Sequence, residues 1–171
     1  MRVLLLDDQE WTTDKLQERL REAGAEVTYA STLEIALTEL RDNEYDTIIS
    51  DFDIDELSGK DFLRIVKGVY GESCETKVVE GGVTPEDIEE YDADIAKVVD
   101  RHFDGDMIDY MDFVTGYGGA ELVLFSATLY GDGVRDDCVL NDVRSFQKNN
   151  ESRGDYSAED AIVSYLGLGH D

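Results

Sequence analysis

The first part of the chain alternates between short apolar runs and longer amphipathic stretches. Apolar side chains dominate residues 3–6 and 45–50, and a short run of alternating character lies at 26–30. Between these runs, leucine and alanine recur every three or four positions in residues 12–23 and 32–42. Uninterrupted apolar runs are typical of strands buried on both faces of a parallel sheet, whereas the leucine spacing is typical of helices with one buried face. The pattern therefore predicts βαβ units built on a parallel sheet.

Turn and capping residues predict where these elements begin and end. Gly24 is expected to stop the first helix, and Ser31 with Glu34 has the pattern of a capping box for the second. Trp11 is expected to pack at the start of the first helix. An acidic loop follows the third strand, and a further helix is predicted at residues 60–67.

Residues 69–119 do not follow this alternation. Thr84 and Pro85 favour a helix start. An apolar stripe with helical spacing follows, formed by Ile88, Tyr91, Ile95, Val98, Val99 and Phe103. A second helical piece is predicted near 106–114. We interpret the region as a helical insertion between the third and fourth strands of the sheet. Its apolar stripe would pack onto the parent domain or, less commonly, form a face that binds a partner protein.

The alternation resumes at the fourth predicted strand, residues 121–126. A loop rich in glycine and aspartate leads to a last short strand at 142–147, and Ser157 with Asp160 favours the start of a final helix. The whole pattern predicts a single α/β domain over residues 1–171. Its core would be a doubly wound five-stranded parallel sheet that carries the insertion.

The charge of the chain limits the partners it can have. It has 41 acidic residues against 15 lysines and arginines, and a formal net charge of −26. Such a surface repels nucleic-acid phosphates and anionic membranes, so we expect no direct binding to either. An excess of aspartate over glutamate and of arginine over lysine is typical of halophilic proteins, whose self-repulsion is screened by salt. The alternative is an acidic protein that mimics DNA, but here the acids are spread over every segment rather than along one path.

Two cysteines, Cys74 and Cys138, fit no metal-ligand or redox spacing and indicate reduced thiols. The N-terminal apolar run is too short for a signal peptide, and no stretch is long enough to cross a membrane. These features predict a soluble, cytoplasmic protein.

Charged and hydroxyl side chains directly follow several predicted strands. Asp7 and Asp8 follow the first strand and Asp51 follows the third, while Ser126 and Lys148 stand at the ends of the last two. The carboxyl ends of parallel strands converge on one crevice, where ligands bind. Carboxylates crowded there repel one another unless a hard cation lies among them, and Mg²⁺ prefers oxygen ligands. The sequence therefore predicts a magnesium site at this edge of the sheet.

Such a site is suited to phosphoryl transfer. A carboxylate beside Mg²⁺ can attack a phosphoryl group and form an acyl phosphate. The metal and the Lys148 ammonium would neutralise the charge on the transferring oxygens, and the Ser126 hydroxyl could donate to one of them. Asp7 and Asp8 would hold the metal from the side opposite Asp51.

These motifs resemble the receiver domain of two-component response regulators, the CheY-like phosphoacceptor domain with its flavodoxin-like fold. The resemblance rests on Leu4-Leu5-Leu6-Asp7-Asp8-Gln9-Glu10, Asp51, Gly59, Ser126-Ala127 and Lys148, which occur in the family's order and at its usual spacings. It covers about residues 1–67 and 120–167, on either side of the insertion.

The resemblance implies a role for each of these residues. Asp51 would be the phosphoacceptor, Asp8 and Asp51 would ligate Mg²⁺ with help from Asp7, and the backbone carbonyl of Asp53 would be a further ligand. Ser126 would follow the phosphoryl group and Lys148 would pair with it. The phosphoryl donor would be a histidine kinase or a phosphotransfer protein, and the output would be binding to a downstream protein rather than enzymatic turnover.

One departure from the family has a structural consequence. The family places an aromatic side chain three residues before its lysine, where this chain has Ser145. Phe146 is one position away, and one position along a strand reverses the face on which a side chain lies. We therefore expect Phe146 to lie on the opposite face of the strand.

Two other functions are compatible with the same residues. Asp51-Phe52-Asp53 also resembles the Asp-x-Asp motif of haloacid-dehalogenase-type phosphatases, in which Asp51 would be the nucleophile and Asp53 the general acid and base. That family places its nucleophile on the first strand, however, and here a whole βαβα unit precedes it. The chain could also be a degenerate receiver that takes no phosphoryl group and acts as an adaptor.

Overall fold

A computed structural model shows the fold. It describes residues 1–54, 62, 66, 69–70, 77–78, 100–106, 109–110, 113, 120–127, 143–148 and 157–168. No helix among these residues is long and apolar enough to cross a membrane.

Five parallel strands form the main sheet, in the order β2-β1-β3-β6-β7. They are β1 (Arg2–Leu6), β2 (Glu26–Ala30), β3 (Thr47–Ser50), β6 (Glu121–Ser126) and β7 (Arg144–Gln147). All five correspond to predicted strands. Every residue of β3 is buried, and so is every residue of β1 except Arg2 at its start. This burial on both faces is what the uninterrupted apolar runs indicated.

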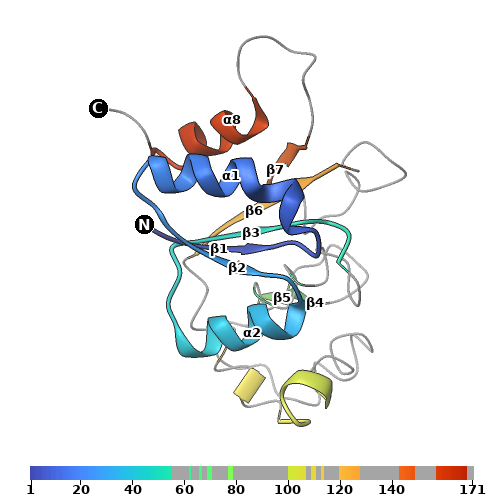
Figure 1. The fold of residues 1–171 in the computed structure, drawn as a ribbon. Coiled ribbons are helices and arrows are strands. Elements are labelled where there is room, and N and C mark those ends of the chain that lie inside the picture. Colours follow the sequence, from blue (N-terminus) through green and yellow to red (C-terminus); the bar gives the residue numbers. More distant parts are fainter. Residues whose placement is uncertain are drawn as a thin grey trace.

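Helices cover both faces of this sheet (Figure 1). On one face lie α1 (Glu10–Glu22) and α8 (Ala158–Tyr165), and on the other lies α2 (Leu33–Asp42). Successive residues of a strand point to opposite faces, so Leu4 of β1 packs in the cluster under α2 while Leu5 packs in the cluster under α1 and α8. The predicted doubly wound α/β fold is therefore confirmed.

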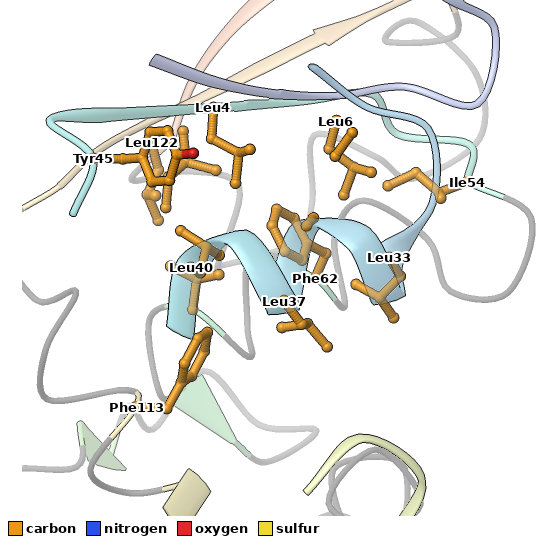
Figure 2. Packing of buried hydrophobic residues seen from close by; sticks show 14 of the residues in the cluster. Leu4, Leu6, Leu33, Leu37, Leu40, Tyr45, Ile54, Phe62, Phe113 and Leu122 are labelled. Atoms are coloured by element: carbon orange, nitrogen blue, oxygen red, sulfur yellow. The ribbon is translucent and has the colours of Figure 1, made fainter. Parts of the chain in front are cut away.

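The cluster under α2 also includes residues from the predicted insertion. Leu33, Leu37 and Leu40 of α2 are buried in this cluster, and Figure 2 shows Phe113 close to the end of the helix that carries Leu40. The buried rings of Phe103 and Phe113 lie edge to face with centroids 5.3 Å apart. Phe103, Tyr110 and Phe113 of the segment therefore pack onto the parent domain, while the rest of the predicted apolar stripe, residues 88–99, lies outside the described residues.

Arg41 at the end of α2 connects the helix to this segment. Its guanidinium lies 4.3 Å from the centroid of the Phe103 ring, donates to the carbonyl of His102 at 2.6 Å and pairs with Asp109 at 3.2 Å. A cation over an aromatic face and a carboxylate partner both favour this position of the side chain. The contact joins residues far apart in sequence on one side of the sheet.

Three local predictions needed correction. The capping residue of α2 is Thr32 rather than Ser31, because the Thr32 side chain accepts from the backbone N–H of Ile35. Trp11 does not pack at the start of α1 but is 75% exposed. The region between β3 and β6 also contains strands, β4 (Val69–Tyr70) and β5 (Lys77–Val78), which pair antiparallel. Strands of two residues leave no period in the sequence that could have predicted them.

Other predicted ends are confirmed. Ser157 caps α8 and accepts from the backbone N–H of Asp160. Gly24 follows α1 with φ of +88°, a left-handed conformation that glycine adopts without steric cost. Residues 62 and 66 of the predicted helix at 60–67 are helical and buried, whereas the helix predicted after Pro85 lies outside the described residues up to residue 99.

Candidate functional site

Asp7 and Asp51 directly follow β1 and β3, and their backbone N–H groups continue the hydrogen bonding between neighbouring strands. Leu6 of β1 is in register with Ser50 of β3. Asp7 and Asp51 come next, and the N–H of Asp51 donates to the carbonyl of Leu6 at 2.8 Å. The N–H of Asp7 donates to Ala30 at the end of β2. The two carboxylates are therefore fixed side by side at the carboxyl edge of the sheet.

Lys148 connects these two carboxylates. Its backbone N–H donates to the carbonyl of Ser126 at 3.0 Å, which places it directly after the paired ends of β6 and β7. Its Nζ lies 2.7 Å from Oδ2 of Asp51 and also forms an ion pair with Oδ2 of Asp7. Lys148 is only 6% exposed. A buried ammonium between two carboxylates is held by charge as well as by hydrogen bonds.

Three carboxylates form a candidate metal site. Single oxygens of Asp7, Asp8 and Asp51 all lie within 4.8 Å of one another. A set of carboxylate oxygens of this kind suits Mg²⁺, which takes one or two carboxylates and keeps several waters. Asp7 is buried, while Asp8 and Asp51 are partly accessible. The donor set therefore fits the predicted ion.

The two oxygens of Asp7 already contact protein donors. Oδ1 accepts from the backbone N–H of Gln9 at 2.8 Å, and Oδ2 accepts from the hydroxyl of Thr12 at 3.0 Å as well as from Lys148. On Asp51, Oδ1 accepts from the N–H of Phe52 at 2.6 Å. Asp7 is thus the most enclosed of the three acids, which favours an assisting role at the metal over a direct one.

The other two predicted residues lie in the same region, and their roles stay predictions. Ser126 is the last residue of β6 and is 1% exposed, and its carbonyl holds the backbone of Lys148. Asp53 is exposed, and its side chain is not one of the three carboxylates of the cluster. The role implied for Asp53 belongs to its backbone carbonyl rather than to its side chain.

Sequence reasoning did not single out Thr12 and Tyr29 as residues of the site. Thr12 lies in the first turn of α1 and its hydroxyl reaches back to Asp7. Tyr29 of β2 is in register with Leu5, and its hydroxyl donates to the backbone carbonyl of Asp7. A hydroxyl in the first turn of the helix after an acidic strand end is the only sequence signal that could have indicated Thr12. Tyr29 has none, because its contact depends on how β2 pairs with β1.

The phenol of Tyr29 is expected to ionise only in strong base. Burial first, and then the negative charges of Asp7, Glu10, Asp8 and Asp14, raise its pKa to about 12. The folded protein therefore keeps this proton at pH values where the unfolded chain loses it. The stability that the raised pKa of Tyr29 gives to the folded protein is complete below pH 10 and is lost as the pH rises towards 12.

This difference is testable with Tyr29→Phe. We expect the urea midpoint of the wild type to fall more steeply between pH 9 and pH 11.5, about the range in which a phenol titrates, than that of the variant. The difference spectrum of ionised tyrosine should also show one late-titrating phenol fewer in Tyr29→Phe. Parallel midpoint curves for the two proteins would contradict the assignment.

The two neighbouring residues of β7 face opposite sides, as expected. Phe146 packs against the cluster under α1 and α8, and its ring centroid lies 5.7 Å from that of Tyr165. Ser145 is exposed. Phe146 therefore packs on the α1 and α8 side of the sheet, and its neighbour Ser145, one position along the strand, belongs to the other face.

Strand-end carboxylates, a buried lysine and a doubly wound parallel sheet together define an α/β domain with an acidic site at its carboxyl edge. The family model "Response regulator receiver domain" matches residues 3–106. The chain therefore belongs to the response regulator receiver domain family. The matched range includes Asp7, Asp8 and Asp51, whereas Ser126 and Lys148 lie beyond it and are placed by the structure.

Solved structures of receivers share the fold. The chemotaxis response regulator CheY4 of Vibrio cholerae has a TM-score of 0.55 and 14% identity, covering 97% of this chain and 96% of that one. The Francisella response regulator 1452 receiver domain has a TM-score of 0.54 and 15% identity, covering 98% and 94%. The response regulator TrrA of Thermotoga maritima, in complex with Mg²⁺-BeF, has a TM-score of 0.52 and 16% identity, covering 97% and 96%. No curated protein is similar enough to the chain to count as a relative.

The phosphatase alternative is not favoured. Asp51 follows β3, the third strand of the chain, and the family match is to receivers. Haloacid-dehalogenase-type enzymes place the nucleophile on their first strand.

Proposed function

We propose that this receiver accepts a single phosphoryl group on Asp51, with Mg²⁺ bound beside it, and acts by binding another protein. The observation that supports this most directly is the pairing of the Lys148 ammonium with Asp51 and Asp7 inside a cluster of three carboxylates. A nucleophilic carboxylate, a cation for the transferred charge and a donor set for a metal are thus present within one small region.

The proposed phosphoryl transfer to Asp51 is a single displacement at phosphorus. An oxygen of the Asp51 carboxylate attacks phosphorus, the bond from phosphorus to the donor's nitrogen or oxygen breaks, and the donor leaves with that electron pair and takes up a proton. The product at Asp51 is an acyl phosphate. Lys148, already 2.7 Å from Oδ2 of Asp51, would then pair with the added phosphoryl oxygens, and the Ser126 hydroxyl would donate to one of them.

We assign the metal to Asp8 and Asp51, with the carbonyl of Asp53 as a further ligand and Asp7 assisting. A bound Mg²⁺ would supply charge neutralisation for the oxygens of the transferred group. The structural neighbour TrrA is in complex with Mg²⁺-BeF, which is consistent with this assignment in a receiver of similar fold. The enclosed oxygens of Asp7 support its assisting role.

The phosphoryl donor would be a histidine kinase or a phosphotransfer protein, and the output a complex with a downstream protein. Residues 69–119 would be a specialised interaction region within the single domain. The exposed Ser145 implies that an aromatic side chain at that position does not carry the signal in this receiver. The excess of negative charge favours a protein partner over nucleic acid.

The proposal is tested by loading the site with a small phosphodonor. With Mg²⁺ and acetyl phosphate, the wild type should gain at most one phosphoryl group per chain in intact-mass spectra, and beryllofluoride should bind with the same stoichiometry. Asp51→Asn should show neither change, because an amide is not a nucleophile for this reaction. The experiments are run at low and at molar salt, since the net charge of −26 favours folding at high ionic strength.

A matched control lies at the other end of the same strand. Asp46 directly precedes β3, is exposed and accepts from the backbone N–H of Arg2, so Asp46→Asn removes an acid without touching the site. This variant should be modified like the wild type. Repeated turnover of an aryl phosphate would contradict the proposal in favour of a phosphatase. No modification at either salt concentration would contradict it in favour of an adaptor.

A further inference from the structure

Thr12 places a hydroxyl between the groups that the proposed reaction uses. Its Oγ1 lies 3.0 Å from Oδ2 of Asp7, 3.4 Å from Nζ of Lys148 and 2.8 Å from the carbonyl oxygen of Gln9. Neither the family resemblance nor the carboxylate cluster includes this residue. Within the described part of the chain, its hydroxyl lies within hydrogen-bonding distance of Nζ of Lys148 and could respond to a change there.

The single proton of the hydroxyl decides what these contacts can be. An ammonium has only donors, so Lys148 donates to the Thr12 oxygen, and the hydroxyl proton then goes to one of two acceptors, Oδ2 of Asp7 or the carbonyl of Gln9. The Gln9 carbonyl also accepts from the backbone N–H of Thr12 at 2.9 Å and is satisfied without the hydroxyl. The proton can therefore be given to Asp7 without leaving a buried acceptor unpaired.

This freedom matters because Asp7 has to share Lys148 with Asp51. Oδ2 of Asp7 has two described donors, the Lys148 ammonium and the Thr12 hydroxyl. When the ammonium turns towards a phosphoryl group on Asp51, the hydroxyl is the donor that stays with Oδ2. A carboxylate as enclosed as Asp7, at 1% exposure, cannot replace a lost donor with bulk water.

We propose that Thr12 is a positioning residue for the phosphoryl-transfer site. Its hydroxyl contacts both Oδ2 of Asp7 and Nζ of Lys148, and keeps these two atoms in place beside Asp51. The inference rests on the proposed function, since it assigns Thr12 a part in that reaction. The hydroxyl touches neither the transferred group nor the metal, and acts through Asp7 and Lys148.

The test compares Thr12→Val, which removes the hydroxyl and keeps the shape, with Thr12→Ser, which keeps the hydroxyl. Thr12→Val should weaken Mg²⁺ binding in calorimetry and slow modification by acetyl phosphate, by roughly twofold to tenfold each, the range that corresponds to the net contribution of a typical hydrogen bond. Thr12→Ser should restore both values to within about twofold. A purely structural role for the side chain would affect stability and leave the Mg²⁺ dissociation constant unchanged.

Thr38→Val is the matched control. Thr38 also lies in a helix and donates to a backbone carbonyl, that of Glu34 at 2.9 Å, but it lies on α2 and has no contact with the acidic site. This variant should keep the wild-type Mg²⁺ affinity and rate. Unchanged Mg²⁺ affinity in Thr12→Val, or no recovery in Thr12→Ser, would overturn the inference.

A metal-free measurement separates this inference from the proposed function. In EDTA, the shifts of the urea midpoint caused by Thr12→Val and by Lys148→Met should be non-additive in the double variant, because the two side chains share Asp7. If the wild type accepts no phosphoryl group, the proposed function fails, yet non-additive shifts would still show the Thr12 coupling. Additive shifts would overturn the coupling even in a protein that is phosphorylated.

Discussion

Lys148→Met should lower the free energy of unfolding by about 3–5 kcal/mol in metal-free buffer, the range found when one partner of a buried ion pair is removed. Methionine keeps the length and most of the apolar contact of the lysine, including its position near the Phe125 ring. What is lost is the charge between Asp7 and Asp51, whose side chains are 1% and 12% exposed. Two carboxylates that shared an ammonium would then repel each other across a largely dry space. Urea denaturation in EDTA measures this loss.

Magnesium should reverse much of the loss. The ammonium and a metal ion compete for the same carboxylate oxygens, so Lys148→Met is expected to bind Mg²⁺ more tightly than the wild type does. At about a hundred times its dissociation constant, the ion returns about 2.7 kcal/mol of stability by mass action. The variant's unfolding midpoint should therefore depend on Mg²⁺ more steeply than that of the wild type.

Lys15→Met provides the matched control. Lys15 of α1 pairs with Glu159 of α8 at 3.3 Å, but its side chain is 57% exposed. An ion pair in that setting contributes about 0–1 kcal/mol, so the variant should differ little from the wild type with or without metal. If the two lysine variants lost the same stability in EDTA, the Lys148 pairing would not be the buried interaction that the geometry indicates.

Leu37→Ala is expected to cost about 2–5 kcal/mol of folding free energy, as for other leucines deleted from a packed core. Leu37 is 2% exposed and belongs to the same buried cluster as Leu4, Leu6 and Phe62 (Figure 2). The cluster combines residues from the sheet, from α2 and from several separate segments, which cannot all move to fill the space of the missing side chain. Chemical denaturation gives the free energy.

Ile35 on the same helix is the control. It is 43% exposed, so Ile35→Ala removes a similar volume from the surface and should change stability by about 0.5 kcal/mol or less. The Mg²⁺ affinity of folded Leu37→Ala should equal that of the wild type, because the acidic site lies at the edge of the sheet rather than under α2. A loss in Leu37→Ala no larger than that in Ile35→Ala would mean that this face is not the closely packed core described above.

Three strands of the main sheet, β1, β3 and β6, could be predicted because each is a short, mainly apolar run that ends at a charge or hydroxyl, whereas β2 was predicted from its alternating pattern. Helix ends were harder to predict from sequence. Ser31 and Thr32 are adjacent, both can cap a helix, and only the backbone conformation at Thr32 decides between them. The pairing of β4 with β5 lies beyond sequence reasoning for a different reason, since two residues are too few to define a period.

Some residues of the acidic site could likewise be predicted from sequence, and others could not. Asp7, Asp8, Asp51 and Lys148 could be brought together from sequence, because topology alone requires the carboxyl ends of neighbouring parallel strands to meet. The contacts of Thr12 and Tyr29 with Asp7 depend on the orientation of single hydroxyls, which topology does not determine. Sequence therefore predicted the charged groups of the site and Ser126, but missed the two hydroxyls that contact Asp7, those of Thr12 and Tyr29.

The exposed indole of Trp11, next to Thr12, provides an intrinsic fluorescence signal for binding. Trp11 is the single tryptophan of the chain, so all indole emission comes from one known place on the first turn of α1, one residue from the hydroxyl that contacts Asp7. A macromolecule that covers this turn would move the ring out of water and shift its fluorescence to shorter wavelength, whereas one that docks elsewhere would leave the spectrum unchanged. Titration of unlabelled protein can therefore report which side of the domain a kinase or target approaches.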